Sequence, residues 1–103
     1  MAAVWVDTTD GNQKKRTGST QFELRVQDGF NLIVHRLLHC TGWFMTCYKL
    51  DITARRLDSE DIEIAKTEAL EKIWVVADQE REKLRLFQNA VKGVINDAST
   101  NIN

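Results

Sequence analysis

Two histidines and two cysteines are the residues of this chain whose chemistry suits a metal ion. His35 and His39 are four residues apart, the spacing at which two side chains share one face of a helix in many zinc sites. Cys40 and Cys47 are seven residues apart, and no CxxC pair accompanies them. Because no complete ligand set is defined, we expect no metal site and interpret these residues as ordinary, partly buried side chains with free thiols.

Catalytic chemistry has little support in the sequence. His39 and Cys40 place a base next to a thiol, but neighbouring residues in a strand point to opposite faces of a sheet and cannot share a proton there. No GxGxxG, P-loop or HExxH motif is present. We therefore predict no catalytic residue, no cofactor and no enzymatic activity. The carboxylates of the C-terminal region are expected on a solvated helix face, and they are Glu60, Asp61, Glu63, Glu68 and Glu71.

A short basic run, Lys14-Lys15-Arg16, has the chemistry to contact phosphate, and Arg55-Arg56 would extend such a patch. The whole chain, however, carries 14 Lys and Arg against 15 Asp and Glu, so it has no overall field that would attract nucleic acid. Weak nucleic-acid binding through Lys14–Arg16 is therefore an alternative and not the leading hypothesis.

The bulk composition predicts one folded domain over residues 1–103. The chain is 43% hydrophobic and 28% charged, close to average globular usage. Residues 7–20 are polar and are expected to form a mobile loop. No apolar run is long enough to cross a bilayer and no signal sequence precedes the first polar segment, so the expected location is the cytoplasm.

Alternating hydrophobicity predicts strands in the first half of the chain. Residues 21–27 alternate between apolar and polar side chains, and the dipeptide Asp28-Gly29 suits a two-residue hairpin turn. The β-rich runs 30–38 and 43–53 follow, which together predict a three-stranded antiparallel meander. Helix remains the alternative over residues 30–50, and would make the protein mostly α-helical.

A long amphipathic helix is expected after the strands, from Ser59 to about Asn96 with Asp58 as its N-cap. At 1.5 Å per residue it would be about 55 Å long, whereas a nine-residue strand spans about 30 Å. Either the helix breaks near residues 78–82, or its second half presents Leu84, Phe87 and Val91 to another chain. The fold class is therefore α+β. The residues at helical spacing are Ile62, Ala65, Ala69, Ile73, Val76, Leu84, Phe87, Val91 and Val94.

The two-residue turn predicts a register in which Leu24 lies opposite Ile33 and Phe22 opposite His35. In this register the core face carries Phe22, Leu24, Val26, Ile33, Leu37, Phe44, Tyr48, Leu50 and Ile52. The opposite face carries Phe30, Leu32, Val34, Leu38, Trp43, Met45 and Cys47. Because one helix cannot cover both faces, we predict that the second face, with Trp43 as its anchor, binds a partner or a second copy. The alternative cover is the N-terminal segment 2–6 with Trp5.

The order of a hairpin, a Gly42-Trp43 strand and an acidic helix start resembles small phage and mobile-element proteins, including some anti-CRISPR inhibitors. The helix start reads Leu57-Asp58-Ser59-Glu60-Asp61, with Ala65-Lys66 and Ala69-Leu70 after it. The resemblance covers roughly residues 21–75 and assigns no functional residue. It implies a protein-binding inhibitor of a host defence complex, and the alternative is a structural subunit of a larger assembly.

Overall fold

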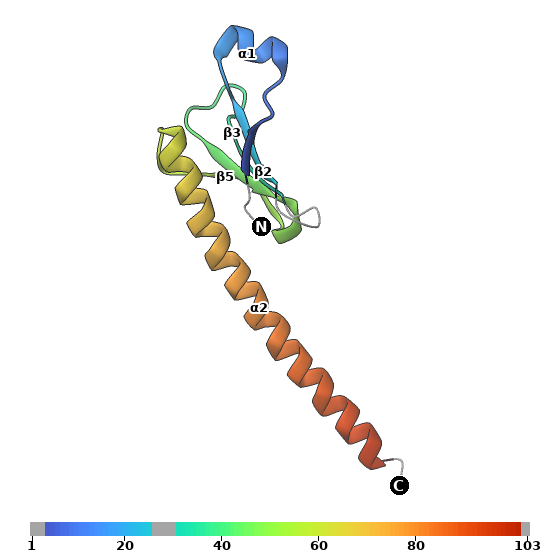
Figure 1. Cartoon of the computed structure of the whole chain (residues 1–103). Helices are drawn as coiled ribbons and strands as arrows, with labels where there is room; N and C mark the ends of the chain where they lie inside the picture. The colour runs from blue at the N-terminus through green and yellow to red at the C-terminus, as the bar shows by residue number, and fades with distance from the viewer. Residues whose placement is uncertain (1–3, 26–30, 102–103) are drawn as a thin grey trace. The chain divides into compact units, whose positions relative to one another are not determined.

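The computed structural model describes residues 4–25 and 31–101, with side chains up to Asp97. Its elements form a five-stranded antiparallel meander followed by a long helix (Figure 1). They are β1 (Val4–Asp7), α1 (Gly11–Thr17), β2 (Gln21–Arg25), β3 (Asn31–His35), β4 (Phe44–Cys47), the 3-10 turn η2 (Tyr48–Leu50), β5 (Ile52–Arg56) and α2 (Ile62–Asn101). The predicted α+β class is confirmed and the mostly helical alternative is wrong.

The chain divides into two compact units, Met1–Lys72 and Ile73–Asn103. The first contains the sheet, α1 and the first turns of α2, and the second contains the rest of α2. The helix is continuous from Ile62 to Asn101, so the alternative of a break near residues 78–82 is wrong. A run of 40 residues without proline gives the helical hydrogen-bond ladder no interruption.

Two strands were missed by the sequence analysis. The segment Val4–Asp7 pairs with β2 as an edge strand, with Val4 opposite Arg25 and Asp7 opposite Phe22. The predicted strand 43–53 is two strands, because the chain turns sharply through η2 and Asp51 adopts a left-handed conformation with φ 56°. The left-handed Asp51 ends η2 and reverses the chain between β4 and β5.

The register between β2 and β3 differs by one residue from the predicted one. Arg25 pairs with Asn31, so five positions separate the paired residues instead of the predicted two-residue turn. The Asp28-Gly29 dipeptide itself lies outside the described residues. Leu24 consequently lies opposite Leu32, and Phe22 opposite Val34. Side chains alternate along a strand, so this shift moves every β3 side chain to the other face of the sheet.

One face of the sheet is the core, and it joins Leu24 of the predicted core face with residues of β3 and β4 that were predicted to be open. Leu32, Val34 and Met45 expose 2% or less of their surface, and Trp43 exposes 3%. The prediction that these residues form an open face is wrong, because the corrected register turns them inward. Cys47 is buried with them at 0%.

Several other residues predicted to lie in the interface or the core differ from the prediction in their burial. Leu38 is 83% exposed in the β3–β4 connection, while Phe30 and Val26 lie outside the described residues. Leu37 and Tyr48, which were predicted to be core, are exposed. Ile33 is only half-buried, because it belongs to the face opposite the core.

Trp43 joins the sheet to the segment that precedes α2. Its indole Nε1 donates a hydrogen bond to the backbone oxygen of Glu60 at 2.9 Å. The Arg36 guanidinium lies 4.3 Å from the centroid of the indole ring. The ring centroids of Phe22 and Trp43 are 6.1 Å apart. An indole whose N–H is satisfied and of which 3% is exposed behaves as core.

The first turns of α2 cover the core face. Ala65 and Ala69 are completely buried, and their small side chains allow close approach of the helix backbone. The Lys66 ammonium lies 4.3 Å from the Phe22 ring centroid and 5.6 Å from that of Trp5. Lys66 therefore contributes its aliphatic stem to packing and its charge to the ring faces. Trp5 lies on this same face, but residues 4–6 belong to an edge strand of the sheet and do not lie across Leu32 and Trp43 as the alternative cover.

Helix α2 begins three residues later than predicted. The Asp61 carboxylate accepts hydrogen bonds from the backbone N–H groups of Glu63 and Ile64, which makes Asp61 the N-cap in place of Asp58. The carboxylate of Glu68 accepts the backbone N–H groups of Asp58 and Ser59 at 2.8–3.1 Å. Residues 58–61 are thus held as a capping loop and cannot join the helix.

The face of the sheet opposite α2 is organised around Thr46, which exposes 4% of its surface. The Thr46 hydroxyl accepts the backbone N–H of Ala54 at 2.9 Å and lies 2.8 Å from Nε2 of His35. Phe44, exposed by 5%, is covered by the ring of His35 and by the guanidinium of Arg56, 4.7 Å from its centroid. Side chains of the sheet itself therefore cover the apolar centre of this face.

Replacing Trp43 by Ala should lower the free energy of unfolding by about 3–5 kcal/mol, the usual cost of removing a buried aromatic side chain. Urea unfolding followed by circular dichroism would measure the loss. Leu38→Ala is the control, because Leu38 is 83% exposed and its truncation should change stability by less than about 0.5 kcal/mol. Equal losses for the two variants would contradict the corrected register.

Candidate protein-binding site

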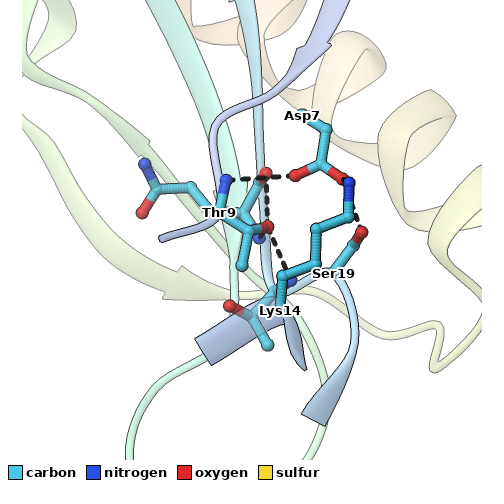
Figure 2. A network of polar contacts seen from close by, with 6 residues as sticks. Asp7, Thr9, Lys14 and Ser19 are labelled. Carbon is cyan, nitrogen blue, oxygen red and sulfur yellow. Dashed lines mark hydrogen bonds and ion pairs between the residues drawn. The ribbon is translucent and has the colours of Figure 1, made fainter. Parts of the chain in front are cut away.

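A polar network fixes the connection between β1 and β2 (Figure 2). Asp7 accepts hydrogen bonds from the Ser19 hydroxyl at 2.5 Å and from the Thr9 backbone N–H at 3.0 Å, and its carboxylate lies 3.2 Å from the Lys14 ammonium. The Thr9 hydroxyl accepts the backbone N–H groups of Thr20 and Gln21. The hydrogen bond from Ser19, followed by those from Thr9 and Lys14, holds the pKa of Asp7 well below its usual range.

This network explains why a helix occupies the segment predicted to be a loop. The Asp10 carboxylate caps α1 by accepting the N–H groups of Asn12 and Gln13, and Lys14 ties the helix to the end of β1. A seven-residue polar helix is unstable alone, so these contacts supply what its sequence cannot. The network has a structural role.

The basic residues are placed at one end of the sheet but several are engaged internally. Lys14 pairs with Asp7, whereas Lys15 and Arg16 are exposed on α1. Arg56 donates a hydrogen bond to the backbone oxygen of Thr41 at 2.7 Å while it covers Phe44. The structure therefore uses part of the predicted phosphate-binding set for folding.

The histidines and cysteines do not form a cluster. His35 bonds within the sheet, His39 lies in the β3–β4 connection, and both thiols are free, with Cys40 exposed and Cys47 buried. Across residues 4–25 and 31–101, no three His, Cys, Asp or Glu side chains are grouped so that they could hold a metal ion.

The second half of α2 carries several of the apolar side chains that the structure leaves uncovered. From Arg81 to Asp97 every side chain is exposed. Leu84, Phe87 and Val91, which were predicted to contact another chain, expose 62%, 67% and 39% of their surfaces. Val94 follows at 68%. Water-exposed apolar residues on this scale are typical of a binding surface.

Leu84, Phe87, Val91 and Val94 form one continuous strip along the helix, which we name the C-terminal stripe. Their spacing of three, four and three residues keeps them on one side of α2. Two shallow hollows follow the stripe: Leu84 and Phe87 line the first, and Phe87 and Val91 line the second. Val94 was placed on the apolar face of the helix with the other three, but only Leu84, Phe87 and Val91 were predicted to contact another chain.

Salt bridges support the helix before the stripe begins. Arg81 pairs with Asp78, Lys83 with Glu80 and Arg85 with Glu82, each with the acid three residues earlier. Pairs at this spacing lie side by side on the surface of an exposed helix, where solvent screens them. The Arg85 guanidinium lowers the pKa of Glu82, and the pKa of Arg85 is raised in return. These pairs add only slightly to the stability of the uncovered helix.

Leu86 is a control position for Leu84 within the second unit. It is 55% exposed, close to the 62% of Leu84, but its place in the helical repeat puts it on a different side of α2 from the stripe. Comparing the two leucines separates the effect of the stripe from that of exposed apolar surface in general.

Comparison with protein-family models, curated proteins and solved structures finds no match to this chain. Among the described residues, no helix combines the length and the apolar character needed to cross a membrane. What is known of the site therefore comes from the geometry of α2.

Asp7→Asn should destabilise the protein at neutral pH and have less effect in acid. Because the folded-state pKa of Asp7 is lowered, its ionised form contributes stability above the unfolded pKa of about 3.9, and this is lost as the pH falls toward the folded pKa. Urea unfolding of both proteins from pH 7 to pH 3 should show a constant difference that begins to shrink near pH 4.

Ser19→Ala is the matched variant, because it removes the largest cause of the lowered pKa. Its effect should not add fully to that of Asp7→Asn, since both act on one network. A difference between wild type and Asp7→Asn that grows toward low pH would contradict the assignment.

Proposed function

We propose that this chain is a non-enzymatic protein-binding module and that its contact surface is the C-terminal stripe. The observation that carries the proposal is the exposure of four large apolar side chains on one side of a continuous helix. Amphipathic helices commonly bind by laying such a stripe into a groove or along another helix.

The energetics of an exposed helix support the same proposal. Most helical stability in proteins comes from packing of an amphipathic face, and salt bridges add little. From Arg81 onward no described side chain is buried. A partner that covered Leu84 and Phe87 would supply the packing energy that this part of α2 lacks.

Two roles fit a module of this kind. The likeness of residues 21–75 to small phage and mobile-element proteins favours an inhibitor that occupies a surface of a host defence complex. The second role is that of a structural subunit. Nucleic-acid binding through Lys14–Arg16 is less favoured, because Lys14 already pairs with Asp7.

The proposal is tested by chemical crosslinking in extracts of the native cells, read by quantitative mass spectrometry. Lys83 and Lys92 are exposed beside the stripe and should crosslink to a protein that covers it. We expect a Leu84→Ser, Phe87→Ser double variant to lose these crosslinks by about tenfold or more, since apolar anchors dominate binding. Leu86→Ser should retain them. Equal crosslinking by all three proteins would refute the stripe as the contact surface.

A further inference from the structure

The second unit carries a seven-residue repeat in addition to its exposed stripe. If Leu84 is numbered a in the heptad abcdefg, the a and d positions are Ile73, Ala77, Glu80, Leu84, Phe87, Val91 and Val94. Glu80 is the one polar residue among them. A heptad repeat of apolar residues is the pattern of a helix that packs along a second helix with the same repeat.

We propose that a second copy of this chain covers the C-terminal stripe, with the two α2 helices antiparallel over residues 73–95. This inference rests on the proposed function, because it names the partner for the same surface. In a coiled coil, side chains at a and d insert between four side chains of the facing helix, so a helix with the same repeat fits this stripe. The hollows beside Phe87 provide such receiving sites, and the chain itself provides such a helix.

Charge complementarity favours the antiparallel orientation. Residues 73–82 contain the acids Asp78, Glu80 and Glu82 and one base, Arg81, whereas residues 83–95 contain the bases Lys83, Arg85 and Lys92 and no acid. An antiparallel pair sets the acidic half of each helix beside the basic half of the other. A parallel pair would set like charges together.

The position of Glu80 leads to the same orientation. In a parallel pair with matched register, each d residue lies beside its own copy, so two Glu80 carboxylates would meet in the seam. In an antiparallel pair a residues lie beside d residues, and Glu80 meets the basic half of the partner instead. Glu80 already pairs with Lys83 on its own helix, which shows that its charge can be balanced at the edge of the stripe.

The exposed surface is comparable with what a stable pair needs, about 800 Å² per partner. Phe87 and Trp74 are 67% and 75% exposed, and a covered aromatic side chain buries about 150–250 Å². Leu84, Val94 and Ile95 expose between 58% and 68% of their surfaces and lie on the same side. Trp74, at an e position, widens the seam.

Sedimentation equilibrium of the full-length protein over a range of concentrations tests the association. We expect a monomer–dimer equilibrium that Leu84→Ala and Phe87→Ala each weaken by about tenfold or more. Leu86→Ala is the matched control, since it makes the same substitution two residues away from Leu84, and it should change the dissociation constant by less than about twofold. Glu80→Leu completes the apolar repeat and should tighten the dimer.

Distance measurement between spin labels tests the orientation. The label is attached to an Asp97→Cys variant in which the exposed Cys40 is replaced by Ser, so that only position 97 and the buried Cys47 retain thiols. For antiparallel helices centred near residue 84, the two labels should be about 40 Å apart, from 1.5 Å of rise per residue. A parallel pair would place them side by side.

The outcomes separate this inference from the proposed function. A monomer at every concentration, with crosslinks to another protein that the Leu84→Ser, Phe87→Ser variant loses, would overturn the second copy and leave the protein-binding proposal standing. A monomer without stripe-dependent crosslinks would overturn both. A dimer that Leu86→Ala weakens as much as Leu84→Ala, or one with the labels side by side, would also overturn the antiparallel pairing.

Discussion

The number of residues between Arg25 and Asn31 decides which side of the sheet becomes the core. With five intervening positions, Leu24 faces Leu32 and both turn toward α2. One residue fewer or more would turn the β3 side chains to the opposite face and leave Ala65 and Ala69 without an apolar surface to cover. The position of Trp43, the start of α2 and the polar centre at Thr46 all follow from this register.

The sequence predicts the elements better than their pairing. Strand β2 and helix α2 have strong period-two and period-3.6 patterns, and both are present. The predicted register of β2 and β3 depended on a two-residue turn at Asp28-Gly29. A dipeptide that tolerates a tight turn does not require one. Strand β1 and helix α1 have weak local patterns and could not be predicted from them. Contacts between residues distant in sequence, such as Asp7 with Ser19, stabilise these elements.

The predictions for the candidate site also differ according to whether they depended on strand pairing. Leu84, Phe87 and Val91 were identified because a long amphipathic helix exceeds what a small sheet can cover, an argument that needs no register. Their exposure is confirmed, and their role in binding stays a prediction. Trp43 and Met45 were misassigned because their exposure depended on strand pairing. Sequence periodicity gives a helix its faces directly, whereas a strand's faces acquire meaning only once its neighbour is aligned.

The Glu68 carboxylate has a consequence for the dynamics of the first unit. It holds the N–H groups of Asp58 and Ser59 from within α2, while the Trp43 indole holds the carbonyl of Glu60 from within the sheet. The capping loop therefore cannot detach without releasing contacts on both sides. Local opening of the loop, the first turns of α2 and the edge of the core around Trp43 should occur as one cooperative unit, whose amides exchange with solvent together.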